Sequence, residues 1–429
     1  MRSLQKILKL VVVSLGMLVP GTILSADVLH ACPFCSAPSL TLSEQVAQSD
    51  VVILVQWTSA VKGTKEQSGT TTYEVLDVVR APQAGAPTKG EKIELVRFRA
   101  GKEGDMFMLF GTKSAKLEWG SPLEVTEASY EYIKHSPSPE LPTQKRLAYF
   151  LKYLEYPDLL VANDAYAEFA NAPYHDIVPV AEHLPREKLR GWITDEKIQT
   201  SRLGLYGLLL GLCGNEDDAK LMESKITQPA DDFRLGIDGI IGGYLLLTKE
   251  TGLEVVEKSK LRDKTVPFSE TYAAMQALRF MWQYGDNRIS HDRLRQSMRI
   301  LLDRTELADL VIADLSRWKD WDSQDRLYSL YGAEGYDIPS IKRAIVRFLL
   351  VSTKDIPKPK TEVSANATDP KPAAGTPAVE PAKTPTSKEA NAQPVEVPAH
   401  VTHGLELIAK IREKDPKTVS EVERFFFVK

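Results

Sequence analysis

The chain has 429 residues, more than the roughly 100 to 200 that a domain with one core usually contains, so we expect two domains and additional segments. Its 54 Lys and Arg residues nearly balance its 58 Asp and Glu residues, and the net charge is -4. A chain so balanced has no field of one sign that would attract nucleic acid. The composition therefore argues against nucleic acid as a partner.

The first residues have the order of a secretory signal: basic residues, then an apolar run, then small residues. The apolar run extends from Leu10 to Leu24 and contains Gly16 and Pro20, which makes it a poor membrane-spanning helix. We expect residues 1–31 to be a signal peptide, and the protein to be secreted, periplasmic or displayed on the cell surface. No later segment is apolar for long enough to span a bilayer, so no integral membrane span is expected after signal removal.

The signal peptide has two candidate cleavage sites. Small residues precede a plausible cut after Ala26 and another after Ala31. The second cut would leave Cys32 as the first residue. A lipid anchor on Cys32 is a third possibility, but His30 fits poorly in the motif that lipidation requires.

Residues 32–135 are predicted to form a small β-rich domain. Thr41 and Glu44 have the spacing of a capping box, which predicts a short helix that ends near Gln48. Runs of β-branched residues, separated by turns with Gly or Pro, then predict strands. The predicted strands span residues 50–55, 70–79, 93–98, 106–110 and 123–126. This pattern favours a small antiparallel barrel or sandwich.

Parts of this domain resemble the netrin-like family, which includes the tissue inhibitors of metalloproteinases. The matching parts are Cys32 near a mature N-terminus and the segments 47–53, 72–75, 78–80 and 93–95. The resemblance implies a five-stranded barrel of the type that binds oligonucleotides or oligosaccharides. The inhibitors carry Cys-x-Cys and further cysteines that pin the N-terminus to the barrel, whereas this domain has only Cys32 and Cys35. This difference weakens the case for protease inhibition.

Residues 140–351 are predicted to be helical. Pro137 and Pro139 end the β-rich domain, because closely spaced prolines continue neither a helix nor a strand. Beyond them apolar residues recur with a helical period. The predicted helix starts recur about every 35 residues, as they do in stacked helix pairs. These starts lie near Arg202, Arg234, Thr271, Leu307 and Ser340.

This helical region resembles the HEAT-like repeats of uncharacterised exported bacterial proteins. The helices at residues 164–170 and 202–207 carry the resemblance. It implies a solenoid that offers a binding surface and no reaction. A group of glycines in one predicted helix is suited to close packing. The group consists of Gly236, Gly239, Gly242 and Gly243.

The last part of the chain is predicted to contain a linker and a cap. Residues 352–399 are rich in Pro, Ala, Thr, Lys and Glu, so they cannot offset the entropy of folding and are predicted to be disordered. Residues 400–429 regain an apolar helical face and are predicted to cap the solenoid. If Phe425, Phe426 and Phe427 were exposed, they would be a liability in water. In the other interpretation the tail is free and its aromatic end binds a partner.

The motif from Cys32 to Cys35 (Cys-Pro-Phe-Cys) has three interpretations. The favoured one is a disulfide between the two cysteines that pins the N-terminus in place. Thiol redox catalysis is the second, although the motif directly follows the signal and no βαβ unit surrounds it. If the signal is cut after Ala31, the amine and carbonyl of Cys32 could chelate a metal ion in a partner enzyme.

The remaining candidate residues are weaker. Trp318 and Trp321 form either an interaction surface or the packing between repeats. Cys213 lies in an apolar helix and is expected to be a buried, inert thiol. No ligand spacing predicts a metal site, no residue is assigned as catalytic, and no phosphate-binding or dinucleotide motif indicates a cofactor.

Together these patterns predict a multidomain α plus β protein with a small antiparallel barrel, a helical solenoid, a linker and a C-terminal cap. The expected function is that of an exported, non-enzymatic binding or scaffold protein whose helical-repeat surface holds a protein partner. The first alternative is a protein like a metalloprotease inhibitor that acts through Cys32. The second is a thiol redox protein that uses Cys32 and Cys35.

Overall fold

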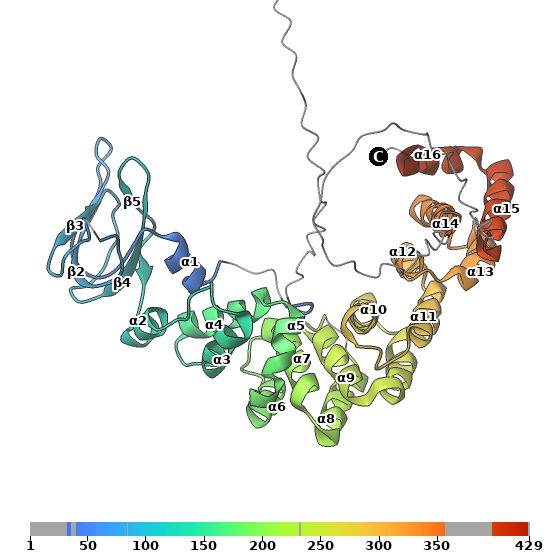
Figure 1. Ribbon diagram of the computed structural model, residues 1–429, viewed down its shortest axis with the longest axis horizontal. Helices are drawn as coiled ribbons and strands as arrows, with labels where there is room; N and C mark the ends of the chain where they lie inside the picture. Colours follow the sequence, from blue (N-terminus) through green and yellow to red (C-terminus); the bar gives the residue numbers. More distant parts are fainter. Residues whose placement is uncertain (1–31, 36–39, 84, 231–232, 357–396, 428–429) are drawn as a thin grey trace, which may run out of the picture.

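A β-sheet unit at one end of the chain is followed by a curved array of helices. The computed structural model describes residues 32–35, 40–83, 85–230, 233–356 and 397–427. Figure 1 shows the sheet at one end of the curve and the C-terminal helices at the other. The predicted α plus β organisation is confirmed. The predicted signal peptide and most of the predicted linker lie outside the described residues.

Six strands of the described chain form one antiparallel sheet. They are β1 (Val51–Val61), β2 (Thr70–Arg80), β3 (Lys92–Leu95), β4 (Met106–Lys113), β5 (Leu117–Trp119) and β6 (Leu123–Glu124). The strand order is β3-β2-β1-β4-β5, and β6 also pairs with β4. No pairing within the described residues joins β3 to β5 or β6, so the antiparallel sheet is confirmed without closure into a barrel.

The first half of β1 is buried on both faces of the sheet. Val52 and Leu54 join the main core, which extends into the helices. Ile53 and Val55 belong to a separate core on the other face. Side chains alternate between the two faces of a strand, so an unbroken apolar run is what a strand covered on both faces requires.

Two helices connect the sheet to the array. In α1 (Leu42–Gln48) the predicted capping box forms, since Thr41 Oγ1 accepts from the amide of Glu44 and the Glu44 carboxylate accepts from the amide of Thr41. The sequence pattern does not predict α2 (Glu127–Lys134). In its capping box the third helical residue after the N-cap Thr126 is Ser129, whereas the usual capping-box pattern has Glu or Gln there.

The array itself consists of helices of uneven length. They are α3 (Thr143–Phe150), α4 (Leu159–Asn171), α5 (Tyr174–Ile177), α6 (Arg186–Thr194), α7 (Leu203–Cys213), α8 (Glu216–Thr227), α9 (Ile237–Val256), α10 (Phe268–Tyr284), α11 (His291–Ile300), α12 (Ala308–Arg317), α13 (Gln324–Leu330), α14 (Pro339–Ser352), α15 (Ala399–Lys414) and α16 (Pro416–Phe427). The helices α7, α9, α10, α12 and α14 begin within three residues of the five predicted starts. Towards the C-terminal end, α12, α14 and α16 line the inner side of the curve and α11, α13 and α15 its outer side (Figure 1).

Glycines bring α7 and α9 into backbone contact. A Cβ atom added to Gly211 of α7 would lie 2.3 Å from the Cα of Gly243. One added to Gly239 of α9 would lie 2.1 Å from the carbonyl oxygen of Gly204. Any side chain would therefore separate the two helices, which explains the glycines that the sequence places in α9.

The last two helices pack against α14. Leu407, Ile408 and Ile411 of α15 are buried in the main core. Gln324 of α13 fixes the junction, because its Nε2 donates to Ser352 Oγ and to the carbonyl oxygen of His400, both at 2.8 Å. Residues 397–427 thus complete the C-terminal end of the array.

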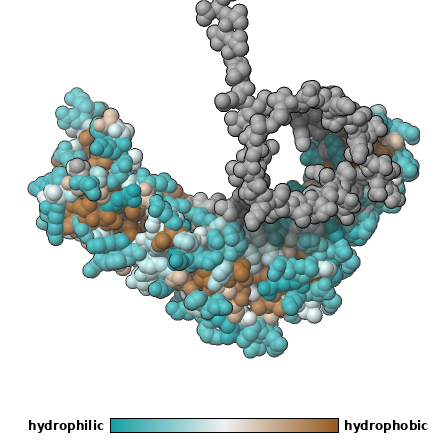
Figure 2. All heavy atoms as spheres, in the orientation of Figure 1, coloured by the Kyte–Doolittle hydropathy of each residue, from teal (hydrophilic) through white to brown (hydrophobic). Residues whose placement is uncertain are grey.

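The visible surface is mainly hydrophilic along the outer side of the helices, with hydrophobic residues between them (Figure 2). Within the ranges that the structure describes, no helix is both long enough and apolar enough to cross a membrane.

Candidate functional site

Residues 32–35, which we call the N-terminal clip, lie against the helices. The amide of Cys32 donates to the carbonyl of Ala170 in α4 at 3.0 Å. Cys32 and Cys35 are joined by a disulfide, with their Cα atoms 5.4 Å apart. The sequence places both cysteines at the start of the predicted β-rich domain, and in the structure Cys32 bonds to α4 of the helical array. The clip contacts the helical array because the apolar surface that accepts Phe34 is there.

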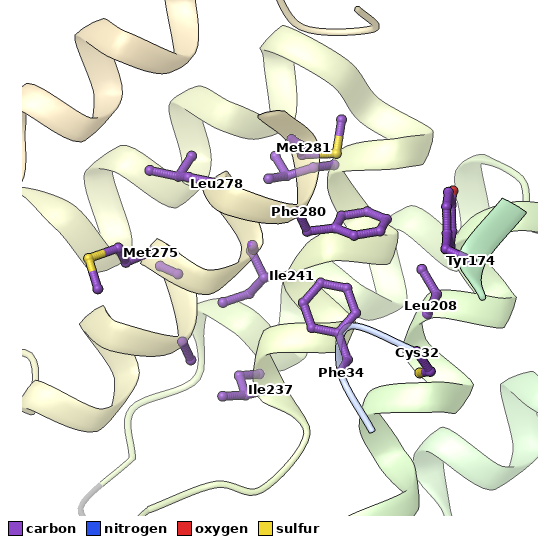
Figure 3. Packing of buried hydrophobic residues seen from close by; sticks show 14 of the residues in the cluster. Cys32, Phe34, Tyr174, Leu208, Ile237, Ile241, Met275, Leu278, Phe280 and Met281 are labelled. Carbon is purple, nitrogen blue, oxygen red and sulfur yellow. The ribbon is translucent and has the colours of Figure 1, made fainter. Parts of the chain in front are cut away.

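Phe34 occupies a socket formed by α7, α9 and α10. Figure 3 shows its ring directed towards Phe280, with Ile237 and Ile241 of α9 nearby. The ring centroids of Phe34 and Phe280 are 4.8 Å apart, and Phe34 is only 7% exposed. Gly242 makes room for the ring, since a Cβ atom there would lie 2.6 Å from its Cζ. This fit makes the clip a fixed part of the helical array.

The position of the clip argues against both metal chelation and lipid attachment at Cys32. Its amide nitrogen binds Ala170, its carbonyl oxygen accepts from the amide of Cys35 at 3.3 Å, and the residue is 6% exposed. Chelation of a partner's metal ion would require the nitrogen and the carbonyl oxygen of Cys32 to be free of these hydrogen bonds. A lipid anchor needs the Cys32 Sγ as a thioether, and the disulfide already uses that atom.

The described chain has a large open groove between α12, α14 and α16, which we call the inner groove. Its volume is about 740 Å³. Fourteen residues line it: Asp309, Ile312, Ala313, Ser316, Arg317, Ser340, Arg343, Ala344, Arg347, Phe348, Val351, Glu421, Val422 and Phe425. It lies between three helices that line the inner side of the curve in Figure 1.

The floor of the inner groove is apolar. Ile312, Phe348 and Val422 are buried side chains, one from each helix. Ala313 and Ala344 are small, which leaves the space between the helices open. Phe425 stands at the edge of the groove and is 75% exposed. An exposed aromatic side chain beside an apolar hollow is typical of an interaction site.

The rim of the inner groove carries arginines. Arg343 and Arg347 are exposed and make no ion pair within the described residues. Of the other rim charges, Arg317 pairs with Asp314 at 2.7 Å and Glu421 lies 4.0 Å from the Lys417 ammonium, whereas Asp309 makes no ion pair within the described residues. The two unpaired arginines were not among the residues predicted from the sequence. They are spaced by one helical turn beside the apolar stripe of α14, and this spacing is the signal that could have revealed them.

The residues predicted as an interaction surface differ in where the structure places them. Trp318 is 4% exposed and stacks on Trp282 with ring centroids 4.3 Å apart, so it packs between helices and does not form a surface. Trp321 is partly buried and packs edge-on against Phe348, below the groove. Phe425 lies at the groove. The side chains of Phe426 and Phe427 lie outside the described part of the chain.

Burial shifts the pKa values of several ionisable groups of the described chain. Burial raises the pKa of Asp164 to about 6, and its carboxylate accepts from Tyr132 Oη and from the amide of Leu42, both at 2.7 Å. Cys213 is only partly buried, whereas the sequence predicts a buried thiol, and desolvation raises the pKa of this thiol to about 11. Across the described ranges, no three His, Cys, Asp or Glu side chains come together as metal ligands.

The geometry therefore offers an open groove with an apolar floor and two exposed arginines that make no ion pair within the described residues. Comparisons with protein-family models, with curated proteins and with solved structures found no match to this chain.

Proposed function

We propose that this protein is an exported, non-enzymatic binding or scaffold protein that holds a protein partner on the inner side of its helical array. The observation that supports the proposal is the inner groove, in which three helices expose an apolar floor beside the exposed Phe425. Such a surface gains free energy when a partner covers it, because apolar area leaves water. Export follows from the basic, apolar and small residues at the start of the chain.

The same proposal includes the finer fold assignments. We infer that the sheet is a variant of the netrin-like barrel and that the helical array is a HEAT-like solenoid. The antiparallel order of the sheet supports the first inference. The recurrence of helices and the curve they form support the second. A curved solenoid typically uses its inner side for binding.

The two alternatives of the sequence analysis have less support. Inhibition of a metalloprotease through Cys32 would require the clip to leave its socket and expose both chelating atoms. Redox catalysis would require an accessible disulfide, and Cys32 is 6% exposed. The binding function requires neither change.

A groove-filling substitution tests the proposal. Ser316 lines the groove on α12, and Ser316→Trp would place an indole in the hollow. The matched control is Ser329→Trp, at an exposed position of the outer helix α13. Full-length wild-type protein and both variants are each mixed with the exported protein fraction of the source cells and cross-linked to the proteins that they bind. The cross-linked partner is identified by mass spectrometry and purified, and its affinity for wild type and for each variant is measured by titration.

We expect wild type and S329W to bind the partner equally and S316W to bind it at least about tenfold more weakly, a difference of about 1.4 kcal/mol. The proposal is wrong if wild type retains no protein, or if S316W binds the purified partner as tightly as wild type does. Thermal unfolding of both variants verifies that they are folded.

A further inference from the structure

We propose that the inner groove binds an acidic amphipathic helix of the partner. This inference rests on the proposed function and specifies the chemistry of what the groove accepts.

The shape of the groove fits a helix. The lining residues of α12 extend from Asp309 to Arg317, a length of about 12 Å at 1.5 Å per residue. That length equals roughly two turns of a helix laid alongside. An amphipathic helix can place its apolar stripe on the floor made by Ile312, Phe348 and Val422, as in other helix-in-groove interfaces.

The charge of the groove selects an acidic helix. Arg343 and Arg347 lie one turn apart on α14, so the two like charges repel each other in the free protein. Neither arginine has an ion-pair partner within the described residues. Asp309 is the one acidic side chain on the rim without an ion pair, and it keeps its negative charge although it accepts from the amide of Leu310 at 2.9 Å. Two unpaired arginines against one unpaired carboxylate leave the rim with a net positive charge. Carboxylates on the flank of a bound helix could therefore pair with two guanidinium groups that make no ion pair among the described residues.

Phe425 gives the groove an anchor at its open edge. It is 75% exposed although its neighbour Val422 is buried in the core. An aromatic side chain in this position would cover the apolar side of a bound helix and exclude water from the charged contacts. The apolar floor holds the helix, and the arginines determine its charge and orientation.

The test uses two peptide probes and full-length protein. Both peptides have 18 residues with leucines at positions i, i+3, i+4 and i+7. One has glutamate on the flanks of that stripe and the other has lysine. Binding of the fluorescein-labelled peptides is measured by anisotropy. The protein variants are R343E/R347E and a control with the same charge change at exposed, unpaired positions elsewhere, R80E/K188E.

We expect wild type and R80E/K188E to bind the glutamate peptide at least about tenfold more tightly than the lysine peptide, and R343E/R347E to reverse this preference. Phe425→Ala should weaken binding of the glutamate peptide. Binding of that peptide should also weaken as salt rises, because the arginine contacts are exposed. Equal affinity for both peptides, no binding of either, or an equal loss in the control would overturn the inference.

Other occupants would be visible in the same experiment. If an unlabelled peptide of residues 357–396 displaces the glutamate probe at equal concentration, the chain's own segment is the occupant. If sedimentation shows a dimer that R343E/R347E dissociates, the occupant is a second copy. Either result overturns the inference.

The outcome can be separated from that of the proposed function. In one outcome S316W loses the captured partner, whereas R343E/R347E still captures it and shows no preference between the two peptides. The proposed binding function would then be supported, and the inference of an acidic helix would be wrong. If neither variant affects partner capture, both proposals are wrong.

Discussion

At the scale of single residues, Phe34 connects the N-terminus to helices far along the chain. Its ring contacts Phe280 and Gly242, and its backbone carbonyl approaches Gly204. The contacts of Phe34, together with the adjacent disulfide, explain how the four residues of the clip keep a fixed position. The clip therefore contributes to the stability of the middle of the array.

Replacing Phe34 with Ala should destabilise the socket by about 3 kcal/mol, because a buried aromatic ring leaves a cavity. Amide protons of α7 and α10 should then exchange with solvent roughly 100-fold faster, as measured by hydrogen exchange with mass spectrometry. Phe233→Ala is the control, since that ring is 65% exposed. Unchanged exchange in the Phe34 variant would show that the clip does not stabilise the helices.

Asp164 should make stability depend on pH. Its pKa is raised from 3.8 to about 6 by burial, so the folded protein keeps this proton in a range where the unfolded chain has lost it. The stability contributed by this group is thus present below about pH 4 and decreases as pH rises to about 6, by roughly 3 kcal/mol.

The variant Asp164→Asn removes that titration. Urea unfolding at a series of pH values should show wild type losing stability relative to D164N between about pH 4 and 6. The exposed Asp195→Asn serves as control and should parallel wild type. A constant difference between wild type and D164N would contradict the raised pKa.

At the scale of helices, the contact between α7 and α9 depends on glycine. Gly211→Ala places a methyl group against the backbone of Gly243, which has no flexible side chain that could yield. We expect a loss of about 1–3 kcal/mol in the free energy of unfolding, measured by urea denaturation. In the control Gly191→Ala, nothing lies within 4 Å of the added atom, so α6 should gain about 0.5–1 kcal/mol. Equal effects of the two substitutions would rule out the close packing.

At the scale of the whole molecule, local patterns predict the helices but not their contacts. The apolar stripes of α7, α9, α10, α12 and α14 predict where these helices start to within three residues, because a stripe is a property of neighbouring residues. The three-residue strand β5 is too short to show alternation. The sequence alone could not place the clip, since its socket is made by residues of α7, α9 and α10.

The inner groove was missed for a related reason. Phe425 is identifiable from its aromatic run, and the stripe of Ala344 and Phe348 predicts the apolar side of α14. The hollow itself exists only because α16 returns to pack beside α14 after the predicted linker. Arg343 and Arg347 become notable only when the groove that they border is known.

This return of the chain leads to a prediction about the complete protein. The sequence predicts that residues 352–399 lack stable structure, so brief treatment with proteinase K should cut there first. Because α15 and α16 bury Leu407, Ile411 and Val422 in the main core, the C-terminal fragment should remain bound. Size-exclusion chromatography should recover both fragments in one peak, and mass spectrometry should identify the cut.

The variant Ile411→Asp supplies the contrast. Ile411 is fully buried, so a carboxylate there cannot be accommodated without a large loss of packing energy. After the same cut its C-terminal fragment should elute separately, while Glu406→Asp, at an exposed position of α15, should behave like wild type. If the wild-type fragments separate, α15 and α16 do not cap the array, and the groove that α16 completes cannot be the site of partner binding.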